Sequence, residues 1–352
     1  MPDAIWIDQP AALEALALTL KTQSNIGIDT EFLRERTFFP KLCLLQIAAG
    51  GAVWCVDTLR LANLDELIQA LTNPGTRKVI HAARQDLEAV YLSSKRVISP
   101  VFDTQIAAGC VGLKPQIGYA ELVKTLLDVT LAKGQTRTDW SKRPLTREQL
   151  EYAADDVVYL GEVAERLDNR LGELGRRHWV LEDCAALEDP LIYEPDPALA
   201  WMKVKGLRQL DPKTRARARV IAVWREKAAR ERNLPRSWII PDADIFDLAH
   251  SDAATLPEGA SSLRDALRDQ MEAALTDNEP SQDARPTPEQ RALADRLVKI
   301  VDRRAAELEL SAEILAPRGE LKALAMGARD SNALCGWRRK EIGESLLAAI
   351  GN

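Results

Sequence analysis

Cysteine and histidine are scarce in this chain of 352 residues, and neither occurs in a pattern typical of a metal site. The five cysteines are widely separated and form no CxxC pair, which argues against a disulfide framework and against a thiolate zinc site. With only three histidines, any metal must be held mainly by oxygen ligands, which favours hard cations such as Mg²⁺ or Mn²⁺. Unpaired cysteines are typical of a reducing compartment, so we expect a cytoplasmic protein.

Long apolar runs and a phosphate-binding loop are also missing. No stretch approaches about eighteen consecutive apolar residues, and the start, MPDAIWID, lacks a basic flank followed by an apolar segment. We therefore expect a soluble protein that is not exported and has no membrane partner. The pattern GxxxxGK[ST] does not occur, so the chain has no helicase motor of its own.

Hydrophobic periodicity separates an α/β part of the chain from a helical part. Three β-rich runs, residues 25–31, 41–49 and 52–58, predict adjacent antiparallel strands, after which strand and helix patterns alternate. The spacing of apolar residues from 146 to 175 predicts one long amphipathic helix. The first part should therefore be an α/β domain.

Two segments rich in proline and polar residues indicate domain boundaries. The first, PLIYEPDP, follows Asp189, and the second, TDNEPSQDARPTPE, covers residues 276–289. The sequence after the first segment has helical patterns throughout. We therefore predict an α/β domain at 1–190 and two all-α domains at 191–280 and 281–352.

Carboxylates occur at spacings that suit a metal-dependent site. Asp29 and Glu31 are two residues apart in a predicted strand, so both side chains project from one face. Asp86 lies where a strand gives way to a helix, and Tyr152 and Asp156 are one helical turn apart. Each feature alone has a common structural explanation: a polar strand edge, an aspartate near a helix N-terminus, and a packed tyrosine.

Together these residues resemble the DEDD superfamily of 3′→5′ exonucleases, in the subgroup with tyrosine in its last motif. Three further segments resemble ribonuclease D in particular: FLRERTFFPKLCLLQIA after the first motif, VFDTQIAA from Val101, and KGQTRTDWSKRPLTREQLEYAADDV from Lys133. The resemblance covers roughly residues 20–175 without a gap. Every acidic position of the pattern is filled, which favours catalysis over binding alone.

The resemblance implies a ribonuclease H-like fold, a mixed sheet flanked by helices, that carries a two-metal exoribonuclease site. By this resemblance Asp29, Glu31, Asp86 and Asp156 would hold two divalent ions, Mg²⁺ or Mn²⁺. A tyrosine with its ordinary pKa near 10 is a poor base at neutral pH, so Tyr152 would orient the attacking water. The expected reaction trims 3′ extensions of transfer-RNA precursors and other small stable RNAs, and releases nucleoside 5′-monophosphates.

The resemblance also suggests where substrate would lie. Phe32 and Leu33 would lie beside the nucleotide being removed, while Gln135 and Trp140 belong to a loop near the mouth of the site. The indole of Trp140 could stack on a base or anchor that loop. His81, Gln46 and Asp103 could contact substrate or support the core.

Basic residues gather in the helical part although the whole chain has a net charge of −6. From residue 203 to 236 twelve residues are basic and three are acidic. This region resembles the HRDC domain, and residues 291–350 resemble a second, more divergent one that could be purely structural. We expect Arg215, Arg219 and Lys227 on or near one solvated face that neutralises RNA phosphates, with Val220, Ile221 and Trp224 turned inward. Alternatively, this is a solvated amphipathic helix whose charges have no specific function.

Two other functions fit parts of the pattern. A 3′→5′ DNA exonuclease uses the same carboxylates, and RNA or DNA selectivity would then depend on recognition of the 2′-hydroxyl. A non-catalytic RNA-binding protein could also retain such a site. In each case we expect the protein to act as a monomer.

Overall fold

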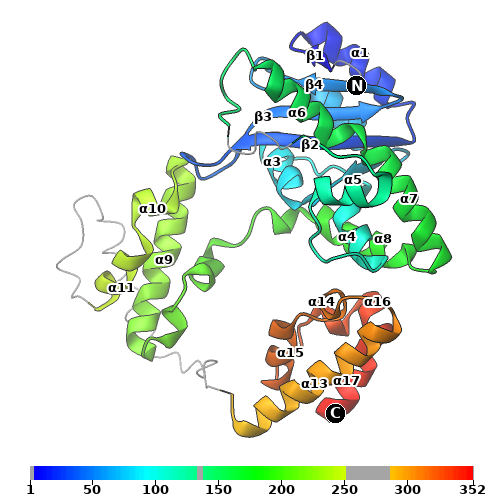
Figure 1. Cartoon of the computed structure of the whole chain (residues 1–352). Helices are drawn as coiled ribbons and strands as arrows, with labels where there is room; N and C mark the ends of the chain where they lie inside the picture. The colour runs from blue at the N-terminus through cyan, green and yellow to red at the C-terminus, as the bar shows by residue number, and fades with distance from the viewer. Residues whose placement is uncertain (1–3, 133–137, 251–285, 352) are drawn as a thin grey trace. The chain divides into compact units, whose positions relative to one another are not determined.

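The computed structural model describes residues 4–132, 138–250 and 286–351, and these form two compact units (Figure 1). Unit 1 comprises Met1–Phe32, Leu42–Pro190 and Pro286–Asn352. Unit 2 comprises Leu33–Lys41 and Leu191–Arg285. The C-terminal segment therefore packs with the α/β part, and a short connection of the α/β part packs with the middle helices. Neither assignment can be read from the sequence.

A six-stranded sheet forms the centre of unit 1. The strands are β1 (Ile5–Ile7), β2 (Asn25–Leu33), β3 (Lys41–Ala49), β4 (Ala52–Val56), β5 (Arg77–Ile80) and β6 (Val101–Asp103). Their order is β1-β4-β3-β2-β5-β6. Strands β3 and β4 pair antiparallel, whereas β1 with β4, β2 with β5, and β5 with β6 pair parallel. The predicted mixed sheet is confirmed, with β2 at its centre.

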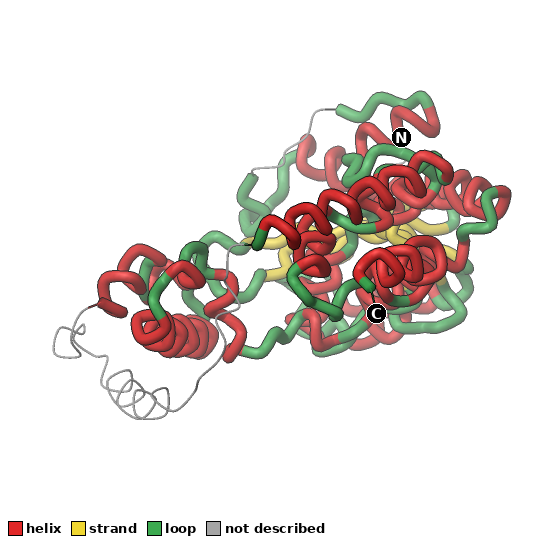
Figure 2. The backbone as a smooth tube through the Cα atoms, turned by 90° about the horizontal axis from the view of Figure 1, so that it is seen from below, coloured by secondary structure: helices red, strands yellow, loops and turns green. Residues whose placement is uncertain are grey.

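Helices pack around this sheet, and Figure 2 shows the strands enclosed between them. They are α1 (Pro10–Leu20), α2 (Asp65–Leu71), α3 (Arg84–Ser94), α4 (Thr104–Cys110), α5 (Tyr119–Leu127), α6 (Arg147–Val158), α7 (Leu160–Glu173) and α8 (Arg177–Ala185). Fully buried aliphatic side chains of the strands, such as Ile26, Ile28 and Leu44, supply the core beneath them. Burial of such residues is the main source of stability of the domain.

The prediction of one continuous helix from 146 to 175 is wrong. Helix α6 begins as expected, because the Thr146 hydroxyl accepts a hydrogen bond from the Gln149 backbone in a capping box. The chain then breaks at Tyr159, where it packs closely on Gly27 of β2. A β-carbon added to Gly27 would lie 3.1 Å from both the Val157 carbonyl oxygen and the Leu160 β-carbon. The apolar spacing continues across the break, so periodicity could not reveal it.

The C-terminal helices share one hydrophobic core with the α/β part of unit 1. They are α13 (Pro288–Glu307), α14 (Ala312–Leu315), α15 (Arg318–Ala325), α16 (Gly336–Arg338), a π-helical turn (Arg339–Gly343) and α17 (Glu344–Ile350). Trp337 stacks on Trp179 of α8, with ring centroids 4.1 Å apart and an interplanar angle of 10°. The guanidinium of Arg338 donates to both carboxylate oxygens of Asp183 at 2.6 and 2.9 Å. This segment is thus an integral part of unit 1.

Unit 2 is built around the basic helix α9 (Pro212–Arg232), followed by α10 (Arg236–Ile239) and α11 (Asp242–His250). Val220 and Ile221 are buried as predicted, and Trp224 packs partly buried against the same cluster.

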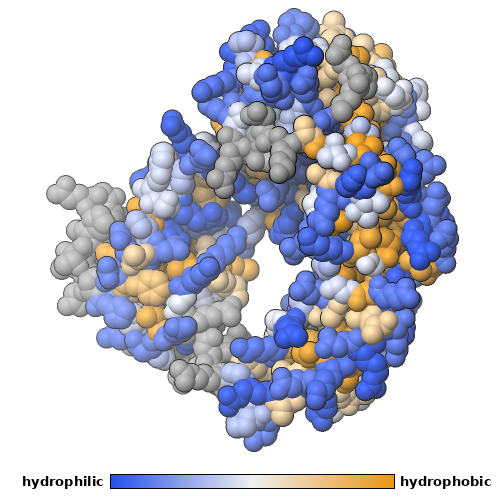
Figure 3. Space-filling model, in the orientation of Figure 1, coloured by the Kyte–Doolittle hydropathy of each residue, from blue (hydrophilic) through white to orange (hydrophobic). Residues whose placement is uncertain are grey.

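In Figure 3 hydrophilic side chains cover most of the visible face of the molecule. Among the residues that the structure describes, no helix has both the length and the apolar character needed to span a bilayer.

Candidate active site

Three of the predicted carboxylates meet between the central strand and one helix. Asp29 and Glu31 project from β2, and Asp156 projects from α6. One oxygen from each carboxylate lies within 4.8 Å of the others, and all three side chains are partly accessible. The close packing of α6 and α7 on Gly27, two residues before Asp29, fixes the separation of strand and helix at this point. Strand alternation and tertiary packing together therefore create the cluster.

Asp86 approaches the same site from the first turn of α3 and is 8% exposed. The Thr30 hydroxyl donates to its Oδ1 atom at 2.5 Å. The preceding turn is held by Asp103, which caps α4 and accepts hydrogen bonds from the backbone amides of Ala82 and Ala83 at 3.1 and 2.8 Å. Asp103 therefore supports the turn that leads to Asp86. These contacts favour a supporting role for Asp103 over contact with substrate.

Burial and mutual repulsion make the ionised form of this cluster unfavourable. Burial, followed by the charges of Asp86, Asp156 and Glu31, raises the pKa of Asp29 well above its ordinary value. Burial and the charges of Asp156 and Asp86 raise the pKa of Glu31 to about 8. Burial is also the largest cause for Asp86 and Asp156, whose pKa values rise to about 7. Oxygen ligands of this kind suit hard divalent cations, which would relieve the repulsion.

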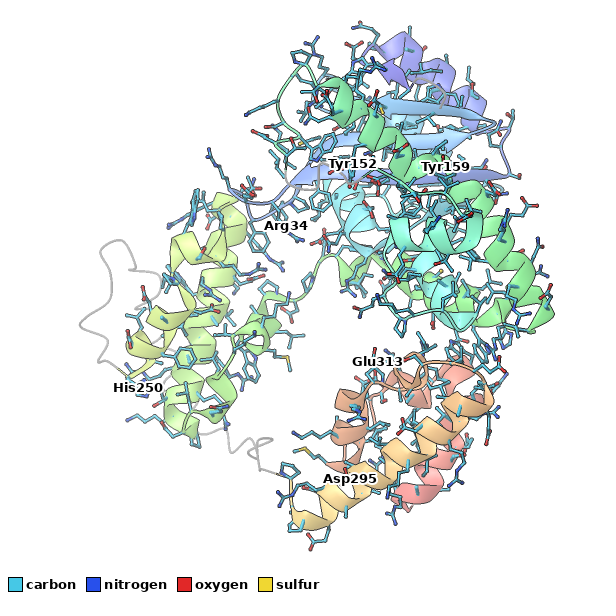
Figure 4. The ribbon with its side chains drawn as sticks, viewed as in Figure 1. Arg34, Tyr152, Tyr159, His250, Asp295 and Glu313 are labelled. Atoms are coloured by element: carbon cyan, nitrogen blue, oxygen red, sulfur yellow. The ribbon has the colours of Figure 1, made fainter. Side chains whose placement is uncertain are left out.

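Tyr152, labelled in Figure 4, belongs to α6. It lies one turn before Asp156, and its hydroxyl hydrogen-bonds the Asp156 carboxylate. Burial and the nearby charges of Asp156 and Glu31 raise the pKa of Tyr152 far above 10. In the metal-free protein the phenol is therefore protonated at neutral pH. It can therefore donate a hydrogen bond to Asp156.

Comparison with known proteins assigns the family. Residues 4–172 match the family of 3′-5′ exonucleases. A ribonuclease D of Pseudomonas paraeruginosa is 35% identical over 99% of this chain and 98% of its own length. A second, from Granulibacter bethesdensis, is also 35% identical, over 99% of this chain and 92% of its own length.

The chain belongs to the ribonuclease D family. A structural match supports this: the crystal structure of Escherichia coli RNase D, described as an exoribonuclease involved in structured RNA processing, has a TM-score of 0.85 and 27% identity. The match covers 99% of this chain and 98% of the E. coli chain. Like its family, this chain is an enzyme of the exoribonuclease class.

The loop expected at the mouth of the ribonuclease D site is anchored by Trp140. This indole is 3% exposed, and its ring centroid lies 6.1 Å from that of Tyr152. Arg143 donates to the Trp140 carbonyl and forms a two-bond ion pair with the buried Asp57. An indole so buried presents no face on which a base could stack, so the structure favours anchoring over base stacking. Gln135 lies outside the described residues.

Phe32 and Leu33 end β2, directly after the carboxylate pair, and both are partly exposed. Their location remains compatible with the predicted contact to a nucleotide. His81, by contrast, is satisfied internally, by the Thr104 hydroxyl at 2.9 Å and the Ile117 carbonyl at 3.0 Å. Gln46 is fully buried on β3, and its side-chain amide atoms have no partner in the described part of the chain.

Tyr119, at the start of α5, is a residue of this region that the sequence did not single out. Its hydroxyl is buried, and its ring centroid lies 5.5 Å from that of His81. Burial, followed by the charge of Asp156, raises its pKa above the usual range. Tyr119 belongs to no motif, so only the packing of α5 brings it near the carboxylates.

The basic helix of unit 2 is less solvated than its sequence suggests. Arg215 and Arg219 are half-buried, and the Arg219 guanidinium lies 4.5 Å from the centroid of the Trp201 ring. Arg225 is buried and pairs with Asp242 at 2.6 Å. Lys227 is exposed, as predicted. Lys227 is therefore more accessible than Arg215 and Arg219, because tertiary packing uses part of the charge of this helix.

Proposed function

We propose that this chain removes nucleotides one at a time from RNA 3′ ends and releases nucleoside 5′-monophosphates. The observation that carries the proposal is the convergence of Asp29, Glu31 and Asp156, with Asp86 beside them. These four residues would hold two divalent ions, Mg²⁺ or Mn²⁺. When bound, such ions supply an activated water and stabilise the charge that develops on the phosphate and on the leaving oxygen.

The side chains of the protein would prepare this site in distinct ways. Thr30 and Asp103 hold Asp86 in place, and Tyr152 holds Asp156. The Tyr152 hydroxyl would also orient the attacking water. Phe32 and Leu33 would pack against the terminal nucleotide at the end of β2.

Replacement of Tyr152 with phenylalanine is expected to reduce turnover by at least about tenfold, because the hydroxyl that holds Asp156 is lost while the ring remains. Single-turnover shortening of a 5′-labelled RNA oligomer measures this step, and circular dichroism checks that the fold is preserved. Turnover equal to that of the wild type would mean that Tyr152 has only a packing role on the face of α6.

The metal-free protein is expected to become less stable as pH rises from 6 to 8. The folded state holds the protons of Glu31, Asp86 and Asp156 more tightly than the unfolded chain does, because their pKa values are raised. Their contribution to stability is fully present below the ordinary values of 3.8 and 4.5 and is lost as pH rises through about 7 to 8.

Thermal melts with chelator, at pH 6 and pH 8, measure this loss. Glu31→Gln should show a smaller fall in melting temperature across this interval than the wild type. Mn²⁺ should raise the melting temperature of the wild type more at pH 8 than at pH 6, because it competes with fewer protons. Equal melting temperatures for metal-free wild type at both pH values would contradict the prediction.

For the helical regions we propose two HRDC domains, at 191–280 and 281–352. The first binds RNA phosphates, and the second, which packs within unit 1 from Pro286 onward, is structural. Lys213, Lys227 and Arg232 are exposed on α9. Changing all three to glutamine is expected to lower the slope of log binding constant against log salt by about 2 for single-stranded RNA. An unchanged slope in filter binding at several salt concentrations would remove this helix from the binding surface.

The substrate we propose is structured RNA, with transfer-RNA precursors as its main class, bound by a monomer in the cytoplasm. A 3′-extended transfer RNA, a 5′-labelled RNA oligomer and the matching DNA strand should be incubated with Mg²⁺, Mn²⁺ or chelator. Stepwise, metal-dependent shortening of the RNAs supports the proposal. Equal shortening of DNA would favour the DNA exonuclease, and binding without shortening would favour a non-catalytic protein.

A further inference from the structure

The connection that follows the catalytic strand is held by helical unit 2. Strand β2 carries Asp29 and Glu31 and ends at Leu33, and β3 begins at Lys41. The segment between them, Leu33–Lys41, belongs to unit 2. Arg34, at its start, is labelled in Figure 4. The chain therefore leaves the metal site and passes directly into a segment that the helical unit fixes.

Phe38 is the aromatic anchor of this segment. The guanidinium carbons of Arg236 and Arg230 lie 4.5 and 5.6 Å from the centroid of its ring. Both arginines pair with the buried Glu226, at 2.5 and 3.6 Å, and Arg230 also donates to the Pro195 carbonyl at 2.5 Å. The two cations are thus held in place before they meet the ring, which limits the entropy lost in the contact.

Asn233 is the polar anchor of the segment. It ends α9 in the left-handed conformation, with φ of 50°, which asparagine tolerates better than most residues. Its Oδ1 atom accepts a hydrogen bond from the Phe39 backbone amide at 3.1 Å. The Phe39 carbonyl in turn accepts from the Thr37 hydroxyl at 2.7 Å. Backbone and side chain of the connection are therefore both tied to the end of one helix.

We propose that Phe38 and Asn233 are positioning residues, through which the helical unit fixes the end of β2 and sets how Phe32 and Leu33 meet the terminal nucleotide. This inference rests on the proposed function of the Asp29 site. Its consequence is specific: the helical unit supports turnover even of a trinucleotide RNA, besides any part it has in binding long RNA. Small displacements near reacting groups lower rates strongly, so loss of either anchor should lower kcat.

The test compares two pairs of variants in the full-length chain. Asn233→Gly suits the left-handed backbone but removes the acceptor oxygen, whereas Asn233→Asp retains it. Phe38→Leu removes the ring, whereas Phe38→Tyr keeps it. The substrate is a 5′-labelled trinucleotide RNA. Its kcat is measured at saturating substrate, beside the salt-dependent binding of a long RNA.

We expect Asn233→Gly and Phe38→Leu to lower kcat on the trinucleotide by about tenfold, with the salt slope for long RNA unchanged. The conservative partners, Asn233→Asp and Phe38→Tyr, should stay within about twofold of the wild type. A wild-type kcat for Asn233→Gly, or an effect confined to the affinity for long RNA, would overturn the inference. Failure of the wild type itself to shorten RNA would instead reject the proposed function.

Discussion

Replacement of Asp29 with asparagine is expected to reduce metal-dependent shortening of RNA by at least about 1000-fold. The same change should raise the melting temperature of the metal-free protein. Burial, followed by the charges of Asp86, Asp156 and Glu31, raises the pKa of Asp29. An amide removes a charge from this repulsive group, so the metal-free fold gains stability while the site loses a ligand.

Two measurements on one preparation test whether Asp29→Asn lowers the activity while it raises the stability of the metal-free protein. Shortening of a 5′-labelled RNA oligomer gives the activity, and melts with chelator and with Mn²⁺ give stability and metal binding. Asp155→Asn is the matched control, because Asp155 is the neighbouring aspartate on α6 but lies outside the three-carboxylate cluster. Unchanged activity in Asp29→Asn would show that the reaction takes place elsewhere.

Replacement of Trp337 with alanine is expected to destabilise unit 1 by about 3–5 kcal/mol. The indole is 1% exposed and stacks on Trp179. Its Nε1 atom donates to Asp183, and its backbone amide donates to Glu182, each at 3.1 Å. The variant would leave a cavity between the C-terminal helices and α8, together with an Asp183 oxygen that has lost one donor.

Urea unfolding followed by circular dichroism measures this effect. Trp238→Ala makes the same substitution at a side chain that is 60% exposed, and should change stability by less than about 0.5 kcal/mol. If Trp337→Ala behaved like this control, the C-terminal helices would not share a cooperative core with the α/β part. A loss comparable to the expected value would show that residues 286–352 stabilise the nuclease itself.

Local patterns in the sequence, together with the family resemblance, were sufficient to find the residues of the candidate site. The two-residue period of a strand placed Asp29 and Glu31 on one face, and the helical period placed Tyr152 and Asp156 one turn apart. The capping residue Thr146 also marked the start of α6 correctly. These features depend on neighbours along the chain, so a single sequence contains the information they require.

Tertiary structure decided which contacts these residues make with segments far away in the sequence. The role of Trp140 depended on the burial of its ring near Tyr152, and the exposure of the basic helix depended on partners such as Asp242. The break between α6 and α7 lies where they pack on Gly27.

The sequence by itself therefore determined the family pattern, the mixed α/β class and the residues of the candidate site. Only the tertiary structure assigned Leu33–Lys41 to the helical unit and residues 286–352 to the nuclease unit. The physical reason is that periodicity reports which face of an element is apolar. The partner that covers this face is chosen by complementary shape and charge between residues far apart in the chain.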